Sequence, residues 1–124
     1  MRAKYCILIA DDDHDLVRTL TDRLIYEGFD TLAAHEGVRV VEQAHRARPD
    51  LIILDLQMPA GTGQTVLERL QARPDTAKIP VIVLTGVGGP ELEGEIRARG
   101  AREYLQKPYE PEDLLRKIRA LLTQ

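Results

Sequence analysis

The sequence predicts an α/β protein in which helices cover both faces of an open, doubly wound sheet of five parallel strands. Three observations predict this fold. Short apolar runs of strand length recur along the chain, helical periodicity lies between them, and proline, glycine and aspartate fall at the junctions. In 124 residues this alternation leaves room for one domain over 1–124. Right-handed crossovers then give a three-layer sandwich.

Three strands are predicted from continuous apolar runs. These runs are YCILIA at 5–10, LIILD at 51–55 and PVIVLT at 80–85. They do not alternate between apolar and polar residues, which is typical of strands that are covered on both faces. Two weaker segments, DTLAA at 30–34 and REYLQ at 102–106, complete the predicted sheet.

Apolar residues at helical spacing predict one helix after each strand. The residues are Leu16, Leu20 and Leu24; Val38, Val41 and Ala44; Val66, Leu67 and Leu70; Leu92 and Ile96; and Leu114, Ile118 and Leu121. Gly28 is placed to close the first helix, and Pro111 to start the last. The tetrapeptide ARPD occurs at 47–50 and 72–75, and each copy is expected to end a helix before the next strand. The predicted order is therefore strand then helix, five times over.

The composition argues against several classes of function. A formal net charge of −3 gives no basic field for a nucleic-acid backbone, and no apolar run approaches the roughly 20 residues that span a bilayer. The first apolar run stops at Asp11 and is shorter than the apolar region of a secretory signal peptide. Cys6 is the only cysteine, so no internal disulfide can form. We expect a cytoplasmic protein without direct nucleic-acid or membrane contacts.

Polar residues stand where the predicted strands end. Asp11 and Asp12 end the first strand, Asp55 ends the third, Thr85 ends the fourth, and Lys107 follows the fifth. The carboxyl ends of parallel strands share one edge of the sheet, where functional groups gather near the switch in strand order. Three carboxylates, a hydroxyl and an ammonium group should therefore meet there.

Three carboxylates in one place need a cation or a proton. Two of them about 4 Å apart repel by roughly 4 kcal/mol at an effective dielectric of about 20. Oxygen ligands with few carboxylates favour Mg²⁺ that keeps several waters. A calcium-binding EF-hand is excluded because Leu16 and Asp22 replace its glycine and glutamate. Zinc is disfavoured because His14, His35 and His45 lack ligand spacing, and we expect all three at the surface.

These motifs resemble the receiver domain of two-component response regulators over essentially the whole chain. The residues that carry the resemblance are Asp11 and Asp12 in ADDD, Asp55 in LIILDLQMP, Thr85 in VIVLTG, and Tyr104 and Lys107 in YLQKPY. Four motifs in order and in register make the resemblance specific. It implies a flavodoxin-like fold.

The resemblance implies a role for each polar residue. Asp55 would take a phosphoryl group from the phosphohistidine of a histidine kinase or a histidine phosphotransfer protein. Asp11, Asp12, Asp55 and the backbone carbonyl of Gln57 would hold Mg²⁺. Lys107 would pair with a phosphoryl oxygen. Asp11 and Asp12 would thus belong to the metal site. Asp13 and Asp15 would instead lie at the start of the first helix, where negative charge suits the helix dipole.

The resemblance also implies a switch. Thr85 would hydrogen-bond the phosphoryl group, and Tyr104 would rotate inward as Thr85 moves. The change would reach the face formed by the fourth helix, the fifth strand and the fifth helix. The alternative is that both residues are ordinary strand formers. A cis peptide bond at Lys107-Pro108 is implied as well.

Glycines at 86, 88, 89, 94 and 100 predict that the fourth helix is marginal. Glycine inside a helix costs about 1 kcal/mol relative to alanine. The acid-first pairs Glu93–Arg97 and Glu95–Arg99 offset only about 0.3 to 0.5 kcal/mol each. We expect phosphorylation to act on this segment.

The loop after Asp55 departs from the family pattern. Ala60, Gly61, Thr62 and Gly63 stand where an apolar and an acidic side chain are usual, which puts the rigidity of the loop in doubt. Thr62 is expected to cap the following helix.

Two other functions compete with a phosphoryl-accepting switch. A dehalogenase-type phosphatase needs a second aspartate two residues after its nucleophile, and Gln57 takes that place. A phosphorylation-independent protein-interaction module with the same fold stays open. No DNA-binding module follows in the sequence, so we expect either a stand-alone receiver or a piece of a larger regulator or hybrid kinase. The sequence does not identify the output protein.

Overall fold

A computed structural model describes residues 4–60, 62–86 and 88–123. Within these ranges, five parallel strands form one sheet in the order β2-β1-β3-β4-β5. The strands are β1 (Cys6–Ala10), β2 (Asp30–Ala34), β3 (Leu51–Asp55), β4 (Val81–Thr85) and β5 (Glu103–Gln106). The chain leaves β1 toward β2 and then crosses back to β3, so the switch in strand order lies beside β1. The predicted fold class is confirmed.

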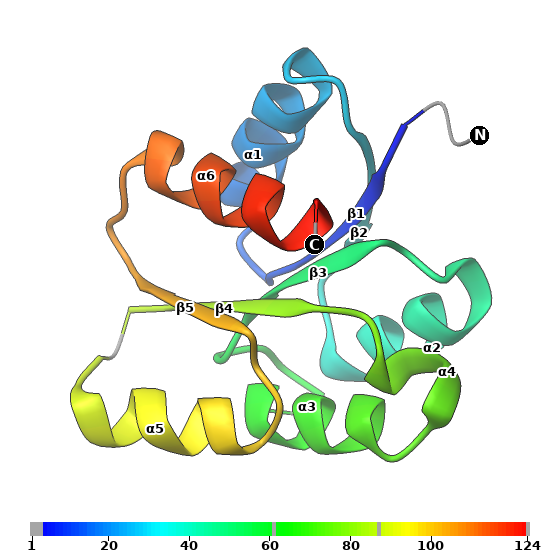
Figure 1. Ribbon diagram of the computed structural model, residues 1–124, viewed down its shortest axis with the longest axis vertical. Helices are drawn as coiled ribbons and strands as arrows, with labels where there is room; N and C mark the ends of the chain where they lie inside the picture. Colours follow the sequence, from blue (N-terminus) through cyan, green and yellow to red (C-terminus); the bar gives the residue numbers. More distant parts are fainter. Residues whose placement is uncertain (1–3, 61, 87, 124) are drawn as a thin grey trace.

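Helices cover both faces of the sheet (Figure 1). They are α1 (His14–Tyr26), α2 (Gly37–Ala47), α3 (Gly63–Gln71), α4 (Pro74–Ala77), α5 (Pro90–Ala98) and α6 (Pro111–Leu122). The pair α1 and α6 lies on one face, and the other helices lie on the opposite face. No helix in the described ranges is long and apolar enough to cross a bilayer.

The core has two layers, one on each face of the sheet. Ile7, Ile9 and Ile53 belong to the layer under α1 and α6, whereas Leu8 and Ile52 belong to the layer under α2, α3 and α5. Successive residues of a strand point to opposite faces. Because both faces are covered, the central strands β1, β3 and β4 are apolar up to the Asp55 and Thr85 that end β3 and β4, which explains the continuous apolar runs.

The short helix α4 was not predicted. The second ARPD does more than end α3, because Pro74 also starts a new helical turn, where proline is tolerated. The buried hydroxyl of Thr76 donates a hydrogen bond of 2.7 Å to the carbonyl of Leu70 and ties this turn to the end of α3. The described chain therefore holds six helices rather than five.

The buried face of α2 differs from the predicted one. Val40 and Ala44 are buried and Val41 is partly buried, but Val38 is 54% exposed. The helix begins at Gly37, whose buried position aligns with Val40 and Ala44 on one side. The side of α2 that faces the core is therefore rotated by part of a turn from the predicted side. The prediction was wrong at Val38 because apolar residues lie on more than one side of this helix.

Candidate functional site

The predicted polar residues meet at the carboxyl edge of the sheet. Asp11 directly follows β1, Asp55 and Thr85 are the last residues of β3 and β4, and Lys107 follows β5. The parallel register of β1, β3, β4 and β5 brings these strand ends together. We call Asp11, Asp12, Asp55 and Lys107 the acidic site.

Three carboxylates of the acidic site are close enough to share one ion. Asp11, Asp12 and Asp55 each offer an oxygen, and these atoms lie within 4.8 Å of one another. Asp11 and Asp55 are buried, whereas Asp12 is exposed. An all-oxygen, partly open donor set fits a hard divalent cation that keeps water ligands.

Lys107 supplies the positive charge that the protein itself brings to the acidic site. Its Nζ donates a hydrogen bond of 3.0 Å to Asp11 Oδ2 and lies 3.8 Å from Asp55 Oδ1. One ammonium group cannot balance three carboxylates. The acidic site therefore retains negative charge that a cation or a proton would compensate.

The surroundings of Asp55 raise the pKa of its carboxyl group. Its burial, followed by the negative charge of Asp11, raises its pKa to about 6. The backbone N–H of Gln57, 3.3 Å from Asp55 Oδ1, and the ammonium of Lys107 act in the opposite direction. Without a cation, Asp55 therefore holds a proton more tightly than an ordinary aspartate.

The acidic run after β1 divides into two parts, as expected. Asp13 is the N-cap of α1, and its side chain accepts a hydrogen bond of 3.1 Å from the N–H of Leu16. Asp15 lies in the first turn, where negative charge suits the helix dipole. The N–H of Asp13 also donates to Asp11 Oδ1 at 3.0 Å, which links the cap to the acidic site.

Thr85 and Tyr104 lie on the neighbouring strands β4 and β5. Thr85 is buried at the end of β4 and borders a recess of about 350 Å³ that Gln57 and Leu92 also line. Tyr104 is partly buried against the core layer under α5. The Lys107-Pro108 peptide bond is cis, as the family resemblance implied.

The loop after Asp55 is anchored at its far end. Thr62 is the N-cap of α3 and accepts a hydrogen bond of 3.3 Å from the N–H of Thr65, as expected. A Cβ at Gly63 would lie 2.6 Å from the backbone of Leu56, so only glycine fits there. Gly61, in the part of this loop that differs from the family pattern, lies outside the described residues.

The middle of this loop is held by α2. The N–H groups of Gly37 and Val38 donate hydrogen bonds of 3.1 and 3.0 Å to the carbonyls of Pro59 and Ala60. Ala60 adopts a left-handed conformation with φ of 55°. Backbone contacts therefore replace the side chains that this loop lacks.

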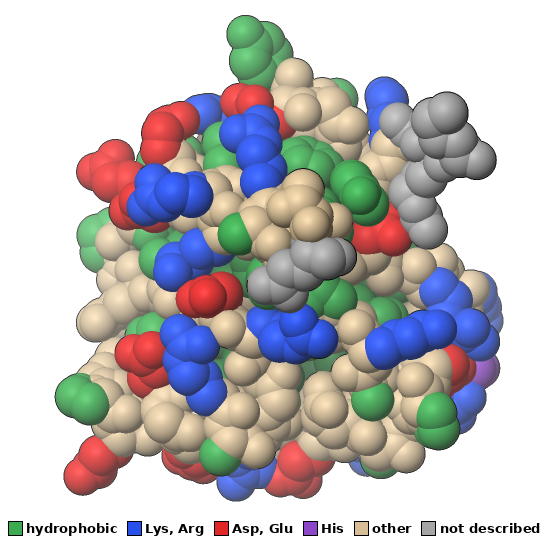
Figure 2. All heavy atoms as spheres, viewed as in Figure 1, with side chains coloured by type: hydrophobic (Ala, Val, Ile, Leu, Met, Phe, Trp, Pro, Cys, Tyr) green, Lys and Arg blue, Asp and Glu red, His purple; other side chains and the backbone are tan. Residues whose placement is uncertain are grey.

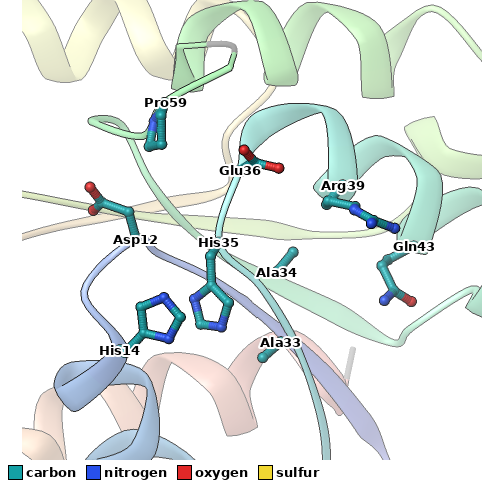
Figure 3. Close-up of a pocket in the computed structure, with 9 residues that line it drawn as sticks. All are labelled: Asp12, His14, Ala33, Ala34, His35, Glu36, Arg39, Gln43 and Pro59. Carbon is teal, nitrogen blue, oxygen red and sulfur yellow. The ribbon is translucent and has the colours of Figure 1, made fainter.

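Sequence reasoning missed His35. Its Nδ1 donates a hydrogen bond of 2.9 Å to the backbone carbonyl of Asp11, and its ring stacks on His14 with centroids 3.8 Å apart. Figure 3 shows the two rings together beside a pocket of about 640 Å³ that Asp12 also lines. His14 and His45 are exposed as predicted, but His35 is partly buried. The β1–β2 register pairs Ala10 with Ala34, so the residues that follow them, Asp11 and His35, come close together, and no sequence pattern signals this pairing.

The fold and the acidic site together define a doubly wound α/β protein with an aspartate cluster and a lysine at the switch in strand order. The chain belongs to the response regulator receiver domain family, whose match covers residues 7–119. It is thus a signalling domain of a two-component system rather than a conventional enzyme, and its family implies a histidine kinase as partner.

Curated relatives of the chain are regulators about twice its length. It is 39% identical over 118 residues to the DNA-binding dual master transcriptional regulator RpaA of Synechocystis, covering 94% of this chain and 48% of RpaA. It is 36% identical to the response regulator MprA of Mycobacterium leprae, covering 94% of this chain and 50% of MprA. The chain therefore spans about half the length of these relatives.

Solved structures agree with the fold over nearly the whole chain. A putative response regulator from Chloroflexus aurantiacus has a TM-score of 0.91 at 29% identity, covering 98% of this chain and 99% of that one. The chemotaxis protein CheY4 of Vibrio cholerae has a TM-score of 0.90 at 30% identity, covering 97% of this chain and all of that one. The flavodoxin-like receiver fold is thereby confirmed.

Proposed function

We propose that residues 1–124 form one receiver domain that acts as a phosphoryl-accepting switch, with Asp55 as the acceptor. The observation that carries this proposal is the position of the Asp55 carboxylate. It lies within 4.8 Å of oxygens of Asp11 and Asp12 and 3.8 Å from Lys107 Nζ. The proposed nucleophile Asp55, the proposed cation site and the ammonium group of Lys107 thus lie together at the carboxyl edge of the sheet.

Mg²⁺ would be held by Asp11, Asp12, Asp55 and the backbone carbonyl of Gln57. When bound, it would neutralise charge on the transferring phosphoryl oxygens. Cation binding would also favour the ionised form of Asp55, whose pKa is raised to about 6 without it. The ionised carboxylate is the form that can attack phosphorus.

Phosphoryl transfer would proceed from a phosphohistidine to Asp55. A carboxylate oxygen of Asp55 forms the new P–O bond, while the P–N bond of the donor breaks and its electron pair stays on the imidazole nitrogen. Lys107, now hydrogen-bonded to Asp11 at 3.0 Å, would turn its ammonium to a phosphoryl oxygen. The same groups would assist later hydrolysis, so the domain would promote its own phosphorylation and dephosphorylation.

The readout would run from Thr85 to the face formed by α5, β5 and α6. Thr85 would hydrogen-bond the new phosphoryl group, and Tyr104 would turn inward as Thr85 moves. The recess between the Asp55 loop and α5 supports this route, because it joins Thr85 to Leu92. On that face, Glu103 of β5 pairs with Arg97 of α5 and Lys117 of α6, so one residue of β5 connects both helices.

The direct partners would be the phosphoryl donor and an output protein, in the cytoplasm. The net charge of −3 argues against nucleic acid as a direct partner of this domain. Acidic and basic side chains are interspersed over the face drawn in Figure 2, which provides no single-sign field there. RpaA is named a DNA-binding regulator, and this chain covers 48% of its length.

Incubation with acetyl phosphate and Mg²⁺ tests the switch. Intact-mass measurement should show a gain of one phosphoryl group in the unsubstituted protein and in Asp15→Asn, the matched surface control. Asp55→Asn should show no gain. No gain in any of the three would favour the alternative function, a phosphorylation-independent interaction module.

A further inference from the structure

The peptide unit that joins Asp11 to Asp12 decides how two metal-binding carboxylates are aimed. A peptide unit is planar and rigid, so its rotation changes the direction of the side chains on both sides. Asp11 is buried and Asp12 is exposed. The exposed partner has the greater freedom, and its position depends on how this peptide unit is held.

Within the described part of the chain, the side chain of His35 hydrogen-bonds the carbonyl of that peptide unit. Its Nδ1 lies 2.9 Å from the carbonyl oxygen of Asp11. A carbonyl oxygen only accepts, so Nδ1 must carry the proton. The preceding peptide unit is held separately, because the N–H of Asp11 donates to the carbonyl of Ala34 at 3.1 Å. The end of β2 thus fixes the backbone on both sides of the Asp11 Cα.

The His35 ring is itself held in place. It stacks on His14 with an angle of 17° between the rings, and His14 is the first residue of α1, two positions after Asp12. Figure 3 shows both rings next to Asp12, at the side of the pocket. His35 therefore contacts the chain before Asp12 through a hydrogen bond and the chain after it through the stack.

We propose that His35 is a positioning residue that aims the Asp11 and Asp12 carboxylates for cation binding. His35 itself would not coordinate the ion, because its Nδ1 donates to the carbonyl and the clustered carboxylates are those of Asp11, Asp12 and Asp55. The inference rests on the proposed function, because it assumes that these carboxylates hold Mg²⁺.

Mg²⁺ titration followed by amide NMR shifts of the whole chain tests this role. His35→Phe keeps a ring for the stack but removes the donor, whereas His35→Asn places an amide N–H near the position of Nδ1. Loss of a group that orients metal ligands typically weakens metal affinity by about tenfold or more. We expect about tenfold weaker Mg²⁺ binding by His35→Phe and less than about twofold by His35→Asn. His14→Phe, the matched control, should also stay within about twofold.

The outcomes separate positioning from a merely structural role. Unchanged Mg²⁺ affinity in His35→Phe, with or without a lower urea midpoint, would overturn the inference, as would equal weakening by His35→Phe and His35→Asn. If His35→Phe does not fold, His35→Gln replaces it, because its amide extends toward the position of Nε2 and should show the same weakening. Absence of Mg²⁺ binding by the unsubstituted protein would overturn the proposed cation site and this inference together. Normal binding with unchanged variants would overturn the inference alone.

Discussion

Asp55 makes the stability of the protein depend on pH in an unusual direction. Its pKa is raised from 3.8 to about 6 in the folded protein, first by burial and then by the charge of Asp11. Between these two values the folded state binds more protons than the unfolded state. The contribution of Asp55 to stability therefore falls as pH rises from about 4 to 6, by an amount on the order of 2 to 3 kcal/mol.

Replacing Asp55 by asparagine isolates this effect from other titrating groups. Without Mg²⁺, we expect Asp55→Asn and the unsubstituted protein to differ little in unfolding free energy at pH 4. At pH 7 the variant should be more stable, by about 2 kcal/mol. Urea unfolding at both pH values measures the difference. The same difference at pH 4 and pH 7 would contradict the raised pKa.

His35 shows why residue-scale prediction from the sequence was incomplete. Asp11, Asp12, Asp55, Thr85 and Lys107 could be placed together because each stands at a strand end, and strand ends are visible as breaks in apolar runs. His35 was judged by ligand spacing along the chain. Its contact with Asp11 depends on the pairing of Ala10 with Ala34, which sequence patterns do not encode.

At the scale of elements, α5 has fewer buried residues than the other long helices, and we expect it to be the least stable of them. Ile96 is its one buried residue among those described, and its N-cap, Gly89, makes no side-chain capping bond. In α1, three residues are buried and Asp13 supplies a capping bond. The expected pairs Glu93–Arg97 and Glu95–Arg99 are present at 3.0 and 3.3 Å, but such exposed pairs add little.

Hydrogen exchange should show α5 amides opening faster than α1 amides. Gly94→Ala should slow exchange in α5, because a Cβ there meets nothing within 4 Å and alanine favours the helix by about 1 kcal/mol. Exchange in α1 serves as the internal control. Equal protection of α5 and α1 in the unsubstituted protein would refute the view that α5 is the low-stability element on which phosphorylation acts.

The elements were predicted unequally well from the sequence. All five strands lie within the predicted segments. Burial on both faces leaves an unbroken apolar signal in β1, β3 and β4, whereas the edge strands β2 and β5 are less buried and gave the two weaker segments. The turn α4 could not be predicted, since it depends on a tertiary hydrogen bond from Thr76 to Leu70. The buried side of α2 was wrong at Val38, because periodicity alone does not fix where a helix begins.

At the scale of the whole molecule, cation binding at the proposed site would stabilise the folded state. A ligand that binds only the folded state raises the unfolding free energy by about 3 kcal/mol at 100 times its dissociation constant. We expect Mg²⁺ to stabilise the unsubstituted protein and Asp15→Ala to this extent, with Asp12→Ala gaining little. Urea unfolding with and without Mg²⁺ measures it. Equal stabilisation of Asp12→Ala and Asp15→Ala would contradict the assignment of Asp12 to the metal site.

The central claim is that Asp55 is the phosphoryl acceptor, and peptide mapping tests it most directly. After treatment with acetyl phosphate and Mg²⁺, borohydride reduction of an aspartyl phosphate converts that aspartate to homoserine, which mass spectrometry locates in the digested chain. The account predicts homoserine at position 55 and, in samples without phosphoryl donor, aspartate there. Modification at Asp11, Asp12 or another position with Asp55 intact would contradict it.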